Sequence, residues 1–236
     1  AQLDGHPECV GEAIVLPDDD EAAIERLLRH PRVRGLKCFS TLARGRDPSQ
    51  AQVRDYLPEA AWEIANARGL MITLHLSRPR ALGDPEDFRH ITAMAHKYPN
   101  ARLVLAHAAR GFATWTCMER VRELRDHENI WFDLSAVCES PSIFAILRHT
   151  GTKRTVWGSD YPVAMLRGKA ISLADGFYWI DADDAGRFAR KKPVRVALIA
   201  TENLLAVRQA CDMLELEPGQ VEDLFYGNAL RLLNER

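Results

Sequence analysis

The sequence has little of what marks a disulfide-rich or membrane-spanning protein. Its five cysteines are odd in number, scattered and without Cys-x-x-Cys spacing, which argues against a disulfide framework and a thiolate zinc site. The longest apolar runs, such as residues 194–200, fall far short of the roughly 20 residues that cross a bilayer. The first residues show neither the basic nor the apolar region of a signal peptide. We therefore expect a cytoplasmic protein with no membrane contact.

Neither positive nor negative charge dominates the sequence. Lys and Arg number 31 and Asp and Glu number 33, for a net charge of −2, so the sequence gives no electrostatic basis for binding nucleic acid. A small molecule is then the simplest partner. The 236 residues are 47% apolar, enough for one sizeable core, and no repeat or flexible linker divides them. We expect a single domain over residues 1–236.

Strand-like runs alternate with helical patterns, which is typical of βα units around a parallel sheet. The predicted strands cover residues 12–16, 35–39, 70–76, 102–106, 130–134 and 155–158. The predicted helices cover residues 22–29, a stretch after Asp47-Pro48-Ser49 that ends at 67, residues 85–97, 114–126, 142–149, 194–214 and 218–233. Residues 174–192 look like an irregular insertion.

This order predicts an α/β fold of the (β/α)8 TIM-barrel type. Six strands do not close an eight-stranded barrel, so we expect the first one or two βα units to be absent from this chain, which would make it N-terminally incomplete.

Three of the predicted strands end in a side chain that binds divalent metals or transfers protons: His75, His107 and Asp160. In a parallel barrel the C-terminal strand ends converge on one mouth, where these side chains would become neighbours. Imidazole and carboxylate groups suit zinc or manganese, and a bound metal makes hydroxide available near neutral pH. Taken singly, a residue of this kind at a strand end is more often a hydrogen-bonded structural side chain than a ligand. Their shared position favours a common site.

Several segments carry a resemblance to a known family. They are residues 34–37 (RGLK), 72–75 (ITLH), 104–107 (VLAH), 157–162 (WGSDYP) and 225–229 (FYGNA). Together they resemble the amidohydrolase-related family (amidohydrolase 2), which includes aminocarboxymuconate-semialdehyde decarboxylase, resorcylate decarboxylases and hydrolases of small acids and lactones. The resemblance runs along almost the whole chain.

The resemblance implies a role for each strand-end residue. His75 would be a metal ligand, Asp160 a metal ligand and general base, and His107 the residue that positions or protonates substrate. The implied metal is zinc, or alternatively manganese, and a homo-oligomer is expected on the same ground. The His-x-His pair of the family's first strand has no counterpart, because the early His6 lies in Gly5-His6-Pro7 outside any strand pattern.

Basic side chains near the predicted mouth are candidates for substrate binding. Arg110 and Arg78 follow the two histidine strand ends, as does Arg80, and a guanidinium can hold a carboxylate in bidentate fashion. Lys37 lies on a predicted strand, and the resemblance implies one candidate role, because some members of the wider superfamily carry a carboxylated lysine there that bridges two metals. The alternative is a lysine that hydrogen-bonds within the barrel mouth or pairs with a carboxylate there.

Further polar and aromatic residues are candidates for the same mouth, and each has a structural alternative. Asp133 and Ser135 could serve the same mouth, although we expect them to cap the next helix. The segment 176–179 (GFYW) could line the pocket, although packing against the barrel rim is the expected role.

The sequence thus predicts a metal-dependent hydrolase acting on a small carboxylated or cyclic substrate, a lactone or amide, with metal-activated water. Non-oxidative decarboxylation of an aromatic or muconate-type acid fits the same residues. A third interpretation is a catalytically silent barrel that binds a ligand, which the missing strand-one histidines favour.

Overall fold

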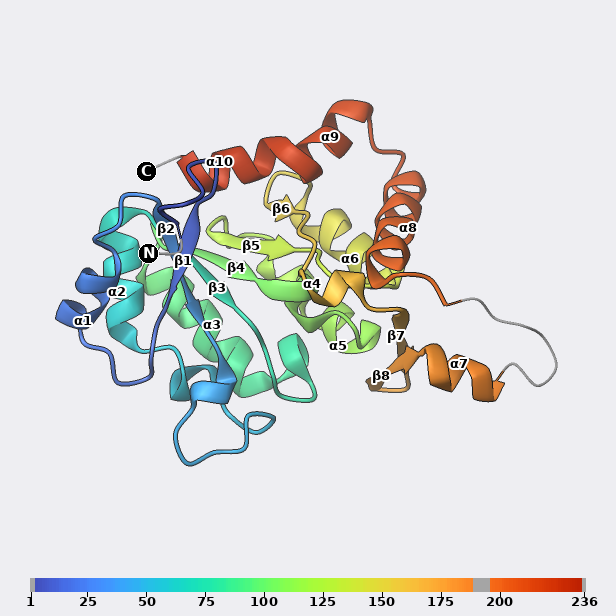
Figure 1. Ribbon diagram of the computed structural model, residues 1–236, viewed down its shortest axis with the longest axis horizontal. Helices are drawn as coiled ribbons and strands as arrows, with labels where there is room; N and C mark the ends of the chain where they lie inside the picture. The colour runs from blue at the N-terminus through green and yellow to red at the C-terminus, as the bar shows by residue number, and fades with distance from the viewer. Residues whose placement is uncertain (1–2, 189–195, 235–236) are drawn as a thin grey trace.

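A single parallel sheet organises the chain. The computed structural model describes residues 3–188 and 196–234. Its six parallel strands follow chain order across the sheet: β1 (Gly11–Ile14), β2 (Val33–Cys38), β3 (Met71–Leu74), β4 (Arg102–Leu105), β5 (Ile130–Asp133) and β6 (Thr155–Val156). Figure 1 shows this sheet at the centre of the molecule, with β1 and β6 at its two edges. All six predicted strands are confirmed, and every bound agrees to within two residues; β1, β3 and β6 each end two residues earlier than predicted.

The register of the strands separates an apolar face from a mixed face. Leu36, Ile72, Leu103 and Ile130 form one row of cross-strand neighbours, and all four are fully buried. This face packs against helices of the main core. Side chains alternate across a strand, so the next row, which contains Lys37 and Thr73, lies on the opposite face. The second face therefore carries the polar side chains that lead toward the strand ends.

Helices connect the strands and cover the sheet. They are α1 (Glu21–Leu27), α2 (Glu59–Arg68), α3 (Pro85–Lys97), α4 (Ala106–Arg110), α5 (Thr114–Met118), α6 (Ser140–Thr150), α7 (Ala182–Phe188), α8 (Ile199–Met213), α9 (Pro218–Glu222) and α10 (Asn228–Asn234). Short 3-10 turns lie at Ser40–Leu42, Val53–Asp55, Ala81–Gly83, Val121–Leu124 and Val163–Met165, and a π-helical turn at Asp223–Gly227 joins α9 to α10.

Local capping explains where α3 begins and α2 ends. The Asp84 carboxylate accepts hydrogen bonds from the amides of Glu86 and Asp87, and Pro85 occupies the first turn of α3. Gly69 adopts a left-handed conformation, with φ of 62°, directly after α2. The predicted bounds of α3 are confirmed.

Four predicted segments were wrong in part. Helix α2 begins only at Glu59, because Pro58 stands at its N-cap in an extended conformation. The predicted helix over 114–126 is divided into α5 and a 3-10 turn. Helix α8 begins at Ile199 rather than at 194, a position that lies outside the described residues.

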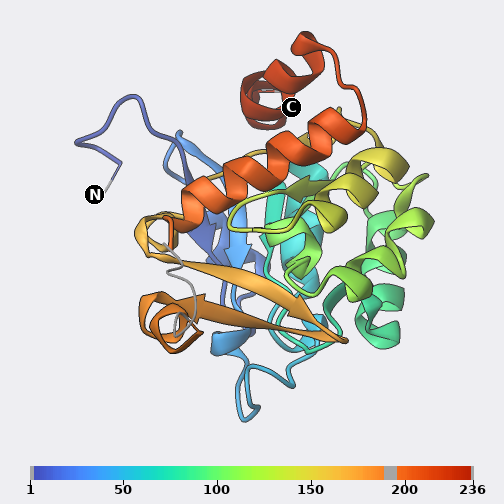
Figure 2. The same cartoon turned by 90° about the vertical axis from the view of Figure 1, so that its right-hand side faces the viewer.

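The fourth correction concerns the predicted irregular insertion. Residues 168–181 form an antiparallel hairpin of β7 (Gly168–Leu173) and β8 (Gly176–Asp181), and α7 follows it directly. Figure 2 shows the two orange strands lying beside the long red helix α8. Positions 189–192 of the predicted insertion lie outside the described residues.

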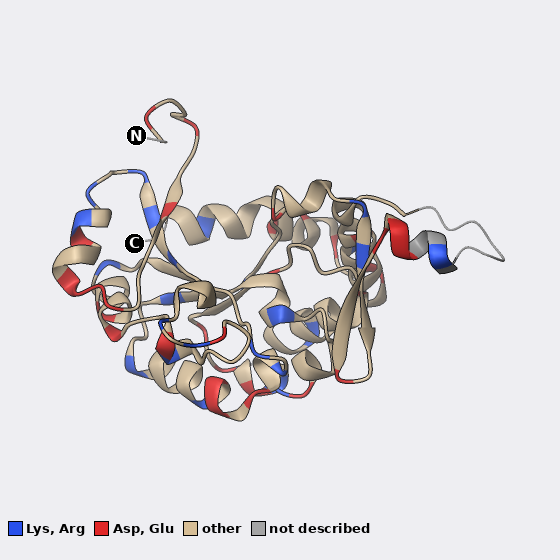
Figure 3. Cartoon of the chain, turned by 60° about the horizontal axis from the view of Figure 1, so that its bottom comes forward, with Lys and Arg blue, Asp and Glu red and all other residues tan. Residues whose placement is uncertain are grey.

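The six-stranded sheet is open at both edges in the described part of the chain. Among residues 3–188 and 196–234, β1 and β6 each pair with one neighbouring strand, so the six strands do not close into a barrel, as the sequence predicted for this number of strands. Figure 3 shows both signs of charge interspersed along the ribbon. No helix in the described part of the chain is long and apolar enough to cross a membrane.

Candidate active site

A pocket of about 580 Å³ opens at the C-terminal ends of the strands. It collects His75 after β3, His107 and Arg110 from α4, and Asp160 after β6. The hairpin β7–β8 supplies an opposite wall through Phe177, Trp179, Ile180 and Asp181. The structure thus brings together four of the five residues predicted to form the site.

His75 lies beside His107, with a distance of 5.2 Å between the ring centroids. Burial, together with the smaller effects of His107, Arg110 and Lys37, lowers the pKa of His75 to about 3. The ring is therefore neutral at physiological pH and retains a lone pair. The hydroxyl of Tyr56 donates to the carbonyl oxygen of His75 at 3.0 Å and fixes its backbone.

The segment that carries His107 and Arg110 has an unusual backbone. His107, Ala108, Ala109 and Arg110 all have φ between 53° and 59°, which makes α4 a left-handed turn rather than an α-helix. Left-handed conformations cost an ordinary residue roughly 1–2 kcal/mol. Strain of this kind concentrates at functional sites, where the surrounding packing holds it in place. Here the turn brings both His107 and Arg110 to the pocket within four residues.

Asp133 and Ser135 lie behind His107. The Nδ1 atom of His107 is 3.1 Å from the carbonyl oxygen of Ser135 and 3.0 Å from its Oγ. The Ser135 hydroxyl donates to Asp133, whose carboxylate also accepts the backbone N–H of His107 at 3.2 Å. The expectation that these two residues cap the next helix was wrong, because the N-cap of α6 is Glu139 and has no side-chain cap hydrogen bond.

Asp160 lines the same pocket and follows β6, an edge strand of the sheet. It has a φ of 57°, a conformation that Asp adopts more readily than most residues. Its position on the pocket wall leaves the carboxylate available to bind a ligand or take a proton. It is therefore the acidic group that the strand-end pattern predicted at this mouth.

The donor set does not complete a metal site in the described part of the chain. No group of three or more His, Cys, Asp or Glu side chains lies close enough to hold a metal ion among residues 3–188 and 196–234. Arg110 and Lys37 also lie near His75, where their positive charge disfavours a cation. The histidine and carboxylate chemistry suits zinc, but the geometry of these residues alone does not fit it.

Arg110 is the cationic residue of the pocket. One of its terminal nitrogens donates to the carbonyl oxygen of Leu76 at 3.3 Å, and its guanidinium lies 5.2 Å from the ring centroid of Phe177. Its Nε is buried without a hydrogen-bond partner. A buried donor left unpaired is costly, so this atom favours an acceptor from outside the chain.

Aromatic rings form the rim of the pocket. Phe112 stacks on His107 at 5.4 Å, and it also contacts Phe177 at 5.1 Å and Trp179 at 5.3 Å between ring centroids. Phe177 and Trp179 line the pocket itself, so the expectation that residues 176–179 only pack against a rim was wrong. These rings, which are inclined to one another, make an apolar wall opposite the polar strand ends.

The other predicted arginines point elsewhere. Arg78 donates to Asp84 at 3.0 Å and to Glu86 at 3.4 Å, and Arg80 pairs with Glu119. Neither is among the residues that line the pocket. Both arginines therefore support the start of α3 and its neighbour α5.

Glu12 was missed by the sequence analysis. It lies on β1, accepts a hydrogen bond from the hydroxyl of Thr73 and has its pKa raised, mainly by burial. The positive charge of Lys37 opposes that rise in the pKa of Glu12. Lys37 therefore lies near a carboxylate, in line with the prediction that it pairs with one. The sequence did contain a signal for Glu12: an acidic side chain within the otherwise apolar strand run Gly11–Ile14.

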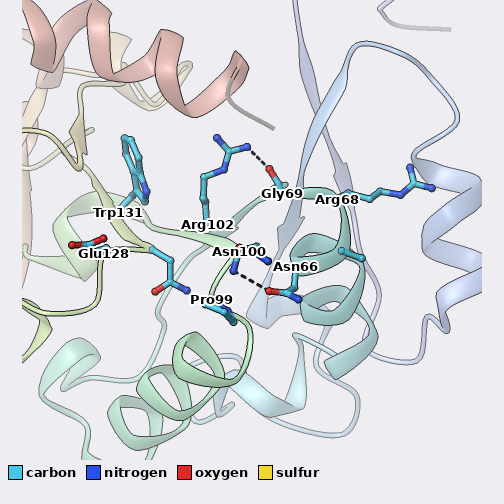
Figure 4. Close-up of a pocket in the computed structure, with 10 residues that line it drawn as sticks. Asn66, Arg68, Gly69, Pro99, Asn100, Arg102, Glu128 and Trp131 are labelled. Atoms are coloured by element: carbon cyan, nitrogen blue, oxygen red, sulfur yellow. Dashed lines mark hydrogen bonds between the residues drawn. The ribbon is translucent and has the colours of Figure 1, made fainter.

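A second pocket, of about 630 Å³, lies at the opposite end of the strands. Figure 4 shows two of its polar side chains already hydrogen-bonded to the backbone: the Arg102 guanidinium donates to the carbonyl oxygen of Gly69, and the side-chain oxygen of Asn66 accepts the backbone N–H of Asn100. Arg68 points away from the pocket in this view. The pocket at the C-terminal strand ends is therefore the better candidate.

Comparison with known sequences gives two matches. The family model described as Amidohydrolase matches residues 1–234. An L-fucono-1,5-lactonase from Burkholderia ambifaria is 28% identical over 178 residues, which are 67% of this chain and 56% of the lactonase. The aligned region thus spans little more than half the length of that relative.

Solved structures with a similar fold include enzymes of more than one reaction type. An amidohydrolase from Burkholderia multivorans with bound zinc matches with a TM-score of 0.63 and 13% identity, covering 98% of this chain and 75% of that chain. A 5-carboxyvanillate decarboxylase from Sphingomonas paucimobilis matches with a TM-score of 0.57 and 16% identity, covering 98% and 69%. At these identities the likeness concerns the fold.

Proposed function

Because this chain belongs to the amidohydrolase family, we propose that it is a hydrolase that acts on a small carboxylated or cyclic substrate, a lactone or amide, in the pocket at the strand ends. One observation carries the proposal: His75, His107 and Asp160, which follow three different strands, meet in a single pocket beside Arg110. Residues so far apart in sequence have no structural need to converge on a cavity.

Each side chain has a distinct part in this proposal. Asp160 takes a proton from the attacking water, and His107 transfers a proton at the scissile group. Arg110 holds a carboxylate of the substrate, which would also satisfy its unpaired Nε. Positioned acid–base groups of this kind typically contribute about 10²- to 10⁴-fold to the rate.

The proposed metal ligands are His75 and Asp160, for zinc or alternatively manganese. The lone pair of neutral His75 supports this assignment, whereas zinc generally takes four ligands and the described residues do not complete that number. When bound, such a metal supplies an activated water. Metal analysis of the purified protein and its His75→Ala variant checks the assignment.

The aromatic wall favours a second candidate, the decarboxylation of an aromatic acid. A planar ring would stack on one of Phe177 and Trp179 and meet the other edge-on, because their planes are 86° apart, while its carboxylate faces the arginine and the histidines. A panel of sugar lactones, pyrone carboxylates and hydroxybenzoates separates the two reactions. Ring opening without gas release supports hydrolysis, and release of carbon dioxide supports decarboxylation.

Asp160→Asn tests the proposed base with whichever substrate of the panel is turned over. The variant keeps the shape of the side chain but cannot accept the proton, so kcat should fall at least 100-fold. Circular dichroism should show an unchanged fold. Exposed Asp175 provides a matched control, because Asp175→Asn should retain normal turnover. Near-normal activity of Asp160→Asn would remove this residue from the mechanism.

A further inference from the structure

The hydrogen bonds around His107 determine which of its ring nitrogens carries the proton. Nδ1 lies within hydrogen-bond distance of two oxygens of Ser135, the carbonyl at 3.1 Å and the hydroxyl at 3.0 Å. A carbonyl oxygen can only accept a hydrogen bond, so Nδ1 must be the donor. The neutral ring then has its lone pair on Nε2.

The Ser135 hydroxyl agrees with this assignment. Its hydrogen is directed to the carboxylate of Asp133, which is an acceptor when ionised. The hydroxyl oxygen therefore presents a lone pair toward Nδ1 rather than a second hydrogen. All three hydrogen bonds can form together only when Nδ1 is protonated.

From this network we infer that Asp133 and Ser135 are positioning residues that hold His107 as its Nδ1–H tautomer, with the Nε2 lone pair available to a ligand in the pocket. The catalytic consequence rests on the proposed function, whereas the tautomer does not. Ser135 is not itself a nucleophile here, because it is only 4% exposed and is not among the residues that line the pocket.

The Asp133 carboxylate is held in a fixed position. It accepts the backbone N–H of His107 at 3.2 Å, the backbone N–H of Ser135 at 3.1 Å and the Ser135 hydroxyl. Gly158, on the neighbouring chain segment, leaves room for it, because a Cβ there would lie 2.8 Å from Oδ1 of Asp133. The left-handed turn that begins at His107 directs the first of these donors toward the carboxylate.

This arrangement changes the expected role of His107. A neutral ring with its lone pair on Nε2 accepts a proton there and can donate one only afterwards. After proton transfer to Nε2, the Nδ1–H bond to Ser135 is kept, and the negative charge of Asp133 stabilises the imidazolium. His107 can therefore protonate the scissile group, as the sequence suggested, only after Nε2 has first accepted a proton.

Nuclear magnetic resonance of the protein labelled with ¹⁵N-histidine tests the inference without a substrate. The resonances of His107 are identified by their loss in His107→Gln. At pH 8, Nδ1 of the wild type should resonate as a protonated nitrogen and Nε2 as an unprotonated one. Protonated Nε2 with bare Nδ1 would overturn the inference.

Two variants test the separate parts of the network. In Asp133→Asn the amide donates to Ser135, so the hydroxyl hydrogen turns toward Nδ1, and the Nε2–H tautomer should gain population. Ser135→Ala keeps the carbonyl acceptor, so it should keep the wild-type tautomer. The exposed Asp212→Asn is the matched control and should change neither the spectrum of His107 nor turnover.

Kinetics separate this inference from the proposed function. Asp133→Asn should lower kcat about 100-fold or more while changing KM little, as expected for a histidine in the wrong tautomer. Loss of activity with an unchanged His107 tautomer would make Asp133 merely structural and overturn the inference. The wild-type and Ser135→Ala spectra decide the question even if Asp133→Asn does not fold. Absence of turnover on every substrate would contradict the proposed function and leave the tautomer result standing.

Discussion

Asp87 shows how burial changes the chemistry of a single residue. Its carboxylate accepts the backbone N–H of Val53 at 2.9 Å, and only 2% of the residue is exposed. Burial, against the opposing hydrogen bond from Val53, raises the pKa of Asp87 to about 6, with a smaller contribution from the charges of Asp84 and Glu86. The Val53 loop continues to Tyr56, whose hydroxyl holds the backbone of His75. A residue outside the pocket thus supports a loop that reaches it.

The raised pKa predicts that Asp87 makes stability depend on pH. The folded state binds the proton more tightly than the unfolded state, so the contribution is present below pH 3.8 and is lost as pH rises through about 6. Asp87→Asn removes the charge that burial disfavours. The variant should therefore exceed the wild type by about 2–3 kcal/mol at pH 8, with the difference vanishing near pH 4.

Urea unfolding at the two pH values measures this difference, with the exposed Asp175→Asn as the control. A constant difference between Asp87→Asn and the wild type at both pH values would show that the carboxyl does not titrate as expected.

At the scale of elements, the hairpin β7–β8 turns a strand-end site into a pocket. It is tied to the rest of the fold by two hydrogen bonds of Ser172: its backbone N–H donates to Glu139 at 2.9 Å, and its hydroxyl accepts the amide of Thr114 at 3.0 Å. Its turn contains Ala174 with a φ of 53°, a conformation that glycine adopts without steric cost. The hairpin is thus anchored near its tip, although the turn residue itself is strained.

Replacing the turn residue should stabilise the protein. Ala174 is exposed, so Ala174→Gly relieves the left-handed strain without opening a cavity, and the free energy of unfolding should rise by about 0.5–1 kcal/mol. The exposed Ala67 in α2 is the matched control, because glycine in a helix should lower stability by about 1 kcal/mol. Urea denaturation measures both, and a change of the same sign in the two variants would contradict this account.

At the scale of the whole molecule, two buried asparagines join the C-terminal helices to the sheet. The amide of Asn203 in α8 donates to the carbonyls of Leu134 at 2.7 Å and Val137 at 2.8 Å. The amide of Asn228 in α10 donates to the carbonyls of Thr152 at 2.7 Å and Thr155 at 2.6 Å. These contacts join segments that are distant in the chain, and they hold α8 and α10 against the segments next to β5 and β6.

Asn228→Ala should therefore weaken the whole fold. It removes the donor for two carbonyls at a position with no solvent exposure, and we expect a loss of about 2–3 kcal/mol in the free energy of unfolding. The exposed Asn234→Ala, in the same helix, should change stability by less than about 0.5 kcal/mol. Chemical denaturation compares the two, and equal effects would show that the buried hydrogen bonds of Asn228 contribute little.

The sequence alone predicted the six strands, the bounds of α3 and the meeting of His75, His107 and Asp160. These features depend on short-range patterns and on one topological rule: alternation of apolar residues, an Asp-Pro helix start, and the convergence of parallel strand ends. Each can be evaluated without knowing which distant side chains come into contact.

Only the tertiary structure decided the partners of these residues. His107 is held by Ser135, 28 positions away, and Phe177 reaches the pocket through a hairpin that the sequence pattern did not reveal. Arg78 and Arg110 were both substrate-binding candidates in the sequence, yet Arg78 pairs with Asp84 near its own position and Arg110 faces the pocket. The reason is physical: hydrogen bonds and burial depend on distances across the fold, and local propensity carries no information about them.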